Sequence, residues 1–264
     1  MTSYIRKLNK EHIIIFSFII TIITLMLSSL FEWDKSPITG TDKLLGDILI
    51  TLFCVILIYV LGINRTAGFG LKGFFKGLLY GIPFIVIGIC AALIGNVGLN
   101  ITQLKPVSLS AMLMFTINML FVGINEEISM RSLLLNNLIL KYGDGKKGIY
   151  KAILISSLIF GMIHLVNIFF LSPITVVVQA INAASAGVLF AAINISSKNI
   201  WACIIIHALV DWISLFIGQC FVGGASVLSV EMTISQGLVM IILGSLPPII
   251  IAIIMINHYI RKQG

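Results

Sequence analysis

The sequence predicts an all-α integral membrane protein, a polytopic bundle of about eight transmembrane helices. Of its 264 residues, 59% are hydrophobic and only 10% are charged, and the mean hydropathy is +1.11. A soluble domain of this length would need far more charged surface than 17 Lys and Arg and 10 Asp and Glu residues supply. Lipid is therefore the expected solvent for most of the chain.

Eight long apolar runs predict the membrane spans, since about 20 residues at a rise of about 1.5 Å each cross the roughly 30 Å hydrocarbon core. The first run has a basic flank like that of a signal peptide, but it is too long and lacks a small-x-small cleavage site before Glu32, so we expect a retained anchor. No repeat or linker divides the chain, which predicts one membrane domain over residues 1–264. The expected spans are 13–31, 44–62, 77–97, 109–140, 150–171, 174–195, 200–222 and 234–257.

The positions of Lys and Arg predict the orientation, because positively charged loops stay on the cytoplasmic side. With a cytoplasmic N-terminus, only Lys35, Lys43 and Lys105 lie outside. Both termini are then cytoplasmic in a multi-pass protein of the cell membrane. The net charge of +7 is explained by the basic cytoplasmic loops and their contact with anionic lipid. The sequence has no stripe of basic and aromatic residues of the kind that binds nucleic acid. The expected cytoplasmic residues are Arg6, Lys7, Lys10, Arg65, Lys72, Lys76, Arg131, Lys141, Lys146, Lys147, Lys151, Lys198, Arg261 and Lys262.

The four cysteines all lie within predicted spans and show no C-x-x-C spacing. This placement is typical of small apolar packing residues rather than of a disulfide framework or a zinc ribbon. The residues are Cys54, Cys90, Cys203 and Cys220.

A few ionisable side chains lie deep in the predicted spans, where a charge costs about 2.5–3.5 kcal/mol even on a lenient insertion scale. Counted along the helices from the nearest cytoplasmic loop, Glu126 and His164 lie roughly 21 Å deep, and His207 and Asp211 roughly 12 and 18 Å deep. Three helices thus bring polar groups to a similar level, which predicts a shared, water-filled site. Asp47, about one turn from the outer end of its span, is expected to reach the interface.

The spacing within EEISMR, residues 126–131, gives its two glutamates different environments. Residues four apart on a helix are neighbours, whereas adjacent residues diverge by about 100°. Glu127 and Arg131 are therefore expected to form an ion pair, which leaves Glu126 without a partner on its own helix. A glutamate of this kind that faces a bundle interior is a candidate general base. The alternative is that all three residues extend above the membrane as a solvated helix end.

Two further motifs lie on later spans. FGMIH places Phe160 one turn before His164, with the aromatic ring under the imidazole. A histidine alone on a helix is more often a packing residue. HALVD places His207 and Asp211 four apart, close enough for the carboxylate to orient the imidazole or to favour its charged form. The alternative is a structural hydrogen-bonded pair between helices.

Together, E-E-x-x-x-R, F-x-x-x-H and H-x-x-x-D, in this order on separate spans, resemble the motifs of the CAAX prenyl protease and bacteriocin-processing family, also known as abortive-infection-like proteins. The resemblance covers roughly residues 109–215. It implies a glutamate-dependent intramembrane endopeptidase with a polar cavity open to the cytosol.

The resemblance also implies roles for individual residues. Glu126 would activate water, His164 would hold that water and return a proton to the departing amine, and His207 with Asp211 would stabilise the oxyanion. Glu127, Arg131 and Phe160 would support the motifs. The eukaryotic branch of the family commonly has Asn where this chain has Asp211, and an ionised Asp does not donate to an oxyanion. Asp211 is therefore expected to be protonated or to act through His207.

Other functions remain open at this point. Glutamate and histidine also bind zinc, although no H-E-x-x-H motif occurs, so we expect no cofactor while zinc stays an alternative. A bacteriocin-immunity factor or a regulator of a membrane partner would bind a peptide without cutting it. A Cys203–His207 nucleophile pair is disfavoured, because a buried thiol has little thiolate. Frequent Ile, Lys and Asn suit a bacterial genome, for which we expect a short hydrophobic peptide or a membrane-bound precursor as substrate.

Overall fold

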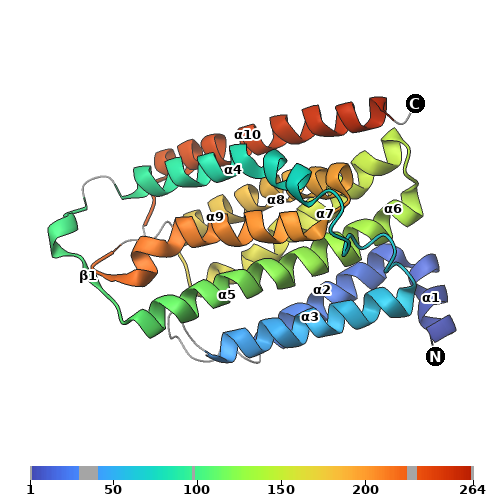
Figure 1. Ribbon diagram of the computed structural model, residues 1–264, viewed down its shortest axis with the longest axis horizontal. Helices are drawn as coiled ribbons and strands as arrows, with labels where there is room; N and C mark the ends of the chain where they lie inside the picture. Colours follow the sequence, from blue (N-terminus) through green and yellow to red (C-terminus); the bar gives the residue numbers. More distant parts are fainter. Residues whose placement is uncertain (1, 30–40, 97–98, 225–230, 263–264) are drawn as a thin grey trace.

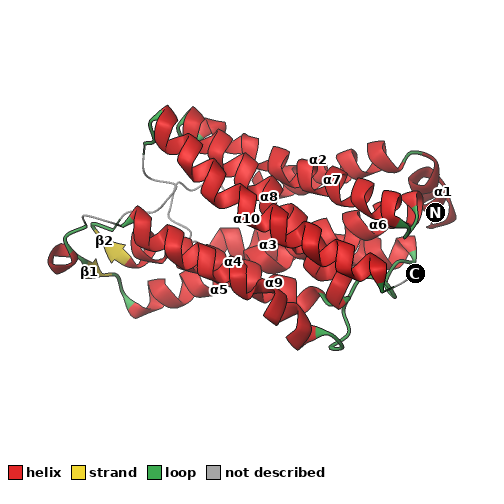
Figure 2. Cartoon of the chain, turned by 90° about the horizontal axis from the view of Figure 1, so that it is seen from above, coloured by secondary structure: helices red, strands yellow, loops and turns green. Residues whose placement is uncertain are grey.

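The protein is an all-α bundle whose long helices run side by side along one axis (Figures 1 and 2). The computed structural model describes residues 2–29, 41–96, 99–224 and 231–262. The only strands in these ranges are β1 (Lys105–Pro106) and β2 (Phe221–Val222), which pair antiparallel at one end of the bundle. The predicted fold class is therefore confirmed.

The helices follow the order expected from the apolar runs. The α-helices are α1 (Thr2–Glu11), α2 (Ile13–Ser29), α3 (Thr41–Leu61), α4 (Phe74–Gly95), α5 (Leu109–Glu127), α6 (Asn136–Tyr142), α7 (Lys146–Ile163), α8 (Pro173–Ser197), α9 (Ile200–Cys220) and α10 (Ile234–Arg261). A π-helix, η2 (Ile128–Leu135), joins α5 to α6. Two 3₁₀ helices are η1 (Ile101–Gln103) and η3 (His164–Phe169), the second of which continues α7.

Seven of these segments are long and apolar enough to cross a membrane, and they correspond to the last seven predicted spans. The first predicted span corresponds to α2, whose apolar stretch Ile13–Thr24 is shorter than the other seven. Its predicted end at residues 30–31 lies outside the described residues, as does residue 97 at the end of the third. The seven segments are Thr41–Leu61, Phe74–Leu93, Leu109–Tyr142, Lys146–Phe169, Pro173–Ser197, Ile200–Cys220 and Ile234–Arg261.

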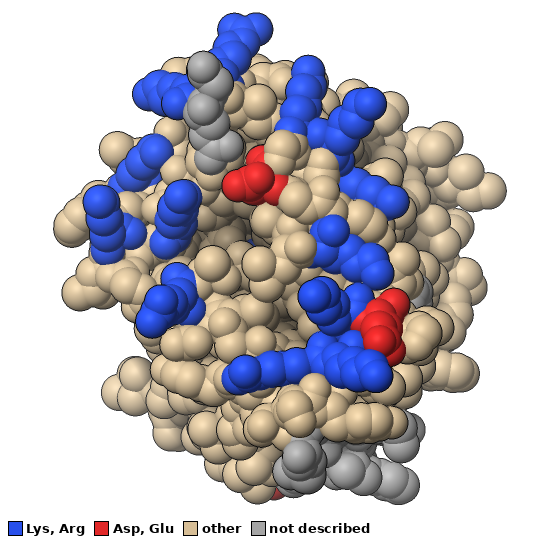
Figure 3. All heavy atoms as spheres, turned by 90° about the vertical axis from the view of Figure 1, so that its right-hand side faces the viewer, with Lys and Arg blue, Asp and Glu red and all other residues tan. Residues whose placement is uncertain are grey.

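Both ends of the chain lie at the same end of the bundle (Figure 1). Seen from that end, Lys and Arg side chains dominate the charged surface (Figure 3). The grouping of these basic residues at one end agrees with the predicted grouping, with one correction, while the side of the membrane that this end faces stays a prediction. Arg131 was assigned to the cytoplasmic set, but it is only 1% exposed and lies within the bundle. Lys35, expected on the other side, lies outside the described residues.

The bundle brings α5 and α9 close together. Central helix α8 packs against α7 and α10, while α9 packs against α4 and α5, and α3 lies on the other side of α5. Gly123 lies at the contact of α5 with α9, where an added Cβ would be 2.9 Å from the carbonyl oxygen of Ile204. Small residues allow this approach of helix backbones in membranes. Side chains one turn beyond Gly123 can therefore reach those of α9.

The π-helix was not expected, because the sequence indicated one regular helix over 109–140. In a π-helix the backbone bonds run from residue i to i+5, and such segments are frequent at functional sites. Polar side chains bond carbonyl groups at both of its ends. Ser129 Oγ donates to Asn125 O at 2.8 Å, and Asn136 Nδ2 donates to Arg131 O at 3.1 Å. Ser132 Oγ donates to Ala67 O at 2.7 Å, which fixes the π-helix to the connection between α3 and α4.

Candidate active site

The first motif forms the buried part of the candidate site. Arg131 Nε lies 3.2 Å from Glu127 Oε2, and the two side chains are 2% and 0% exposed. The predicted ion pair is therefore present. A solvated helix end is excluded, because every residue from Glu127 to Leu138 is buried and the helical segment continues to Tyr142.

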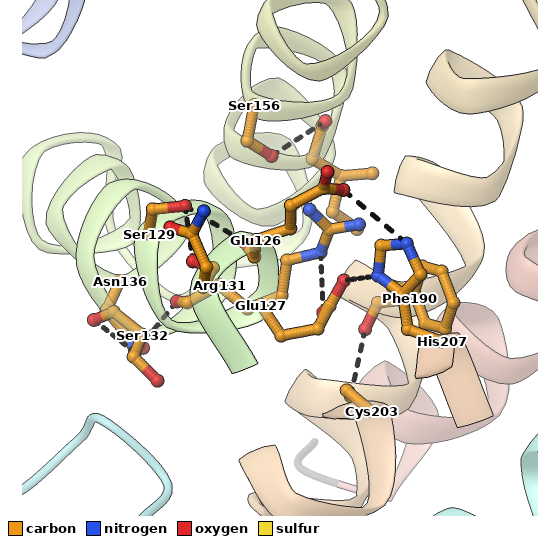
Figure 4. A network of polar contacts seen from close by, with 12 residues as sticks. Glu126, Glu127, Ser129, Arg131, Ser132, Asn136, Ser156, Phe190, Cys203 and His207 are labelled. Atoms are coloured by element: carbon orange, nitrogen blue, oxygen red, sulfur yellow. Dashed lines mark hydrogen bonds and ion pairs between the residues drawn. The ribbon is translucent and has the colours of Figure 1, made fainter. Parts of the chain in front are cut away.

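Glu127 also contacts His207, which the sequence did not predict. Glu127 Oε1 lies 2.8 Å from His207 Nδ1, across the contact between the first motif and α9 (Figure 4). A carboxylate paired with Arg131 is an acceptor only, so Nδ1 is the donor in this hydrogen bond. Glu127 therefore fixes the orientation of the imidazole, a role that we had expected of Asp211.

The other ring nitrogen of His207 faces two carboxylates that remain partly exposed. Its Nε2 lies 3.5 Å from Glu126 Oε2 and 3.4 Å from Asp211 Oδ2. The side chains of Glu126 and Asp211 are 30% and 35% exposed, whereas that of His207 is 8% exposed. Glu126 of α5 and the His207–Asp211 pair of α9 therefore converge, as predicted. The accessible carboxylates are the two that lie on the Nε2 side of His207.

Aromatic rings enclose the buried charges. Phe160 and Phe190 lie 4.7 and 5.3 Å from the guanidinium carbon of Arg131, and Phe190 stacks on the imidazole of His207 at 4.9 Å. Rings in these positions attract cations through their negative faces and exclude water. Phe160 belongs to the second motif, but no motif indicated Phe190 on α8, because that helix carries no histidine or charged residue.

His164 lies beside this cluster. Its ring contacts that of Phe160 at 5.0 Å, as FGMIH predicted, but the rings meet edge-on at 86° instead of stacking. Its Nδ1 lies 2.9 Å from the carbonyl oxygen of Phe160. A carbonyl only accepts, so Nδ1 carries the proton and Nε2 of the neutral ring is left as an acceptor. Phe160 is also 6.0 Å from the ring of His207, so His164 is connected to the other motif residues through Phe160.

The geometry of the site also bears on the two alternative mechanisms, a zinc site and a Cys203–His207 nucleophile pair. Among the described residues, no group of three or more His, Cys, Asp and Glu side chains is arranged to hold a metal ion. A zinc ligand offers a free ring nitrogen, whereas both nitrogens of His207 face carboxylates. Cys203 is free and buried, and its Sγ lies 3.7 Å from the carbonyl oxygen of Phe190. All four cysteines are free thiols.

Asp47 occupies an unexpected position. We expected it to reach the interface, but it is only 3% exposed, because α3 packs this face against α5. Its Oδ1 accepts a hydrogen bond of 2.9 Å from Asn125 Nδ2, and Lys43 Nζ lies 3.7 Å from Oδ2. Asp47 thereby contacts the residue directly before Glu126.

The three motifs lie within a segment that a family model recognises. The model described as type II CAAX prenyl endopeptidase Rce1-like matches residues 108–213. This segment is similar to that family. The match confirms the resemblance that the motifs indicated over 109–215, and it covers less than half of the chain. Neither a curated protein nor a solved structure matches the chain.

The Rce1-like segment contains every predicted site residue, and it spans α5, η2, α6, α7, η3, α8 and part of α9. The seven apolar segments indicate a multi-pass membrane protein, and the family whose model matches this segment is one of endopeptidases.

Proposed function

We propose that the protein is an intramembrane endopeptidase in which Glu126 activates the water that attacks a peptide bond. The observation that carries this proposal is the contrast between the adjacent glutamates. Glu127 is fully buried, with one oxygen on Arg131 and the other on His207. Glu126 remains 30% exposed, so its carboxylate is available to a water molecule and a substrate.

The reaction needs first a base and then a proton donor. Glu126 removes a proton from water as the oxygen attacks the scissile carbonyl carbon, which gives a tetrahedral intermediate with a negative oxygen. The C–N bond then breaks, and the proton held by Glu126 or by His164 passes to the departing amine. General bases and acids of this kind contribute typically 10²–10⁴-fold each. His164 suits the task of holding water, because its Nε2 is the free acceptor.

His207 is the proposed donor to the negative oxygen. Glu127 holds Nδ1, which turns Nε2 toward Glu126 and Asp211. An imidazolium at this place donates through Nε2, and a fixed donor to an oxyanion contributes about 3–4 kcal/mol. Asp211, 3.4 Å from Nε2, acts through His207 by favouring that charged form. This assignment suits an ionised Asp, which accepts hydrogen bonds but does not donate them.

The proposed substrate is a hydrophobic peptide or a membrane-bound protein precursor that reaches the site from the cytoplasmic side. A site enclosed by helices of a membrane bundle admits an apolar segment more readily than a charged one. The proposed reaction needs no metal, since the nucleophile is a water molecule from solvent and the base and the oxyanion donor are side chains.

A cleavage assay tests this proposal. Purified protein in detergent would be incubated with internally quenched apolar peptides, made with and without a C-terminal prenylcysteine motif, and products identified by mass spectrometry. We expect cleavage that survives strong chelators, in protein that contains no stoichiometric zinc by elemental analysis. Loss of cleavage on chelation and its recovery with one added metal would instead establish the zinc mechanism. No cleavage of any peptide would favour the immunity or regulatory function.

The orientation is tested separately. Single cysteines placed at Asp144 and near each terminus of a variant without native cysteines should react with a membrane-impermeant maleimide only after the cells are opened. A cysteine at Lys105, the first residue of β1 at the other end of the bundle, is the control and should react in intact cells. Labelling of the Asp144 position in intact cells would refute a cytoplasm-facing site.

A further inference from the structure

One more carboxylate is buried beside the first motif. Asp47 on α3 is 3% exposed and accepts the 2.9 Å hydrogen bond from Asn125, the residue before Glu126. A charge inside a membrane bundle is costly and marks a functional role more often than a packing role. Lys43 Nζ on the same helix, 3.7 Å from Asp47 Oδ2, offsets part of that cost. Apolar side chains would join α3 to α5 without any such cost, so packing alone does not account for Asp47.

The hydrogen bond lies on the face of the helix that is anchored to the rest of the bundle. Ser129 and Ser132 lie on the side of this helix that faces away from His207 (Figure 4), and Ser129 contacts Asn125 through the 2.8 Å bond from its Oγ to the Asn125 carbonyl oxygen. Asn125 bonds Asp47, and Ser132 bonds the carbonyl oxygen of Ala67. Ser129 Oγ bonds back to the carbonyl oxygens of Asn125 and Glu126, at 2.8 and 3.1 Å, where α5 passes into the π-helix.

The opposite face of the same helix carries the buried pair. Glu127 and Arg131 point toward His207, away from Ser129 and Ser132 (Figure 4). Glu126 precedes Glu127 in α5 and is rotated by about 100° from both Asn125 and Glu127, so it lies between the two faces. Rotation of this helix about its axis would therefore swing the Glu126 carboxylate away from Nε2 of His207, which is 3.5 Å from it. The buried pair resists rotation on one side of the helix, and the Asp47 contact resists it on the other.

We infer that Asp47 is a positioning residue for Glu126: through Asn125 it sets the rotation of the end of α5 and thereby the direction of the Glu126 carboxylate. The inference rests on the proposed role of Glu126 as the base. It predicts an effect on the chemical step, because a misplacement of about 1 Å can cost about 10²-fold in rate. Substrate binding should change little.

The test compares variants of Asp47 in the full-length protein, with the internally quenched peptides described above. Asp47→Ala removes the acceptor and should lower kcat by about 10–10²-fold, with KM within about threefold of that of the wild type. Asp47→Asn keeps an oxygen that accepts from Asn125, so kcat should return to within about threefold of the wild-type value. Ser245→Ala is the matched control, because it removes a part-buried 2.8 Å hydrogen bond between α10 and Asn182 on α8, away from the motifs.

All rates are divided by the amount of folded protein, which is measured by size-exclusion chromatography. If Asp47→Ala fails to accumulate, Asn125→Ala removes the same bond from the other side and should show the same fall in kcat. A wild-type kcat in the Asp47→Ala variant would overturn the inference. Failure of both Asp47→Ala and Asn125→Ala to fold would overturn it too, because the contact would then be structural only. If the Asp47→Ala variant keeps the wild-type kcat and a separate Glu126→Gln variant is inactive, the inference about Asp47 is overturned while the proposed function stands. A wild-type protein that cleaves no peptide would reject the proposed function itself.

Discussion

Glu126→Gln is expected to abolish most peptidase activity, with a fall of at least ~10²-fold, the lower range for loss of a general base. Gln has the same shape and keeps one hydrogen-bonding oxygen, but it does not take a proton from water. The side chain is 30% exposed and is not part of the buried pair, so membrane abundance and thermal stability should match those of the wild type. Initial rates with internally quenched peptides, normalised to folded protein, give the measurement.

Glu231→Gln is the matched control, because it makes the same chemical change at an exposed glutamate before α10 and should leave both activity and abundance unchanged. Wild-type activity in the Glu126→Gln variant would mean that Glu126 is not the base. Retention of a biological function by this variant, in a protein without measurable cleavage, would point to a binding protein of the immunity or regulatory kind.

Glu127→Gln is expected to act on folding rather than mainly on the chemical step. It leaves Arg131, which is 1% exposed, as a buried charge without its carboxylate. Removal of one partner of a buried pair typically costs about 3–5 kcal/mol. The amide oxygen of Gln still accepts from His207 Nδ1, so the activity per folded molecule should fall far less than in Glu126→Gln. Membrane abundance and thermal denaturation in detergent measure the loss.

A double variant shows whether the two residues are coupled. Glu127→Gln with Arg131→Gln removes both charges, and it should recover part of the stability that Glu127→Gln loses. Glu11→Gln, at an exposed position on α1, serves as the control and should cost nothing measurable. Additive losses in the double variant would show that the 3.2 Å contact contributes no coupling energy.

The sequence by itself determined the class of the protein and the residues of the candidate site. Long apolar runs require helices, because backbone groups in lipid must bond within their own segment. The fixed rotation of about 100° per residue placed Glu127 beside Arg131, and Phe160 beside His164. These contacts lie within one helical turn, so local geometry is sufficient to predict them.

Only the tertiary structure decided how these turns face one another. The bond from Glu127 to His207, the ring of Phe190 over the imidazole and the contact of Asp47 with Asn125 all join different helices. Their geometry depends on the rotation and separation of each pair of helices, which close packing at residues such as Gly123 sets, and no spacing along the chain encodes it. The π-helix was likewise hidden, because Ser129 and Asn136 stabilise it by bonds that α-helical periodicity does not predict.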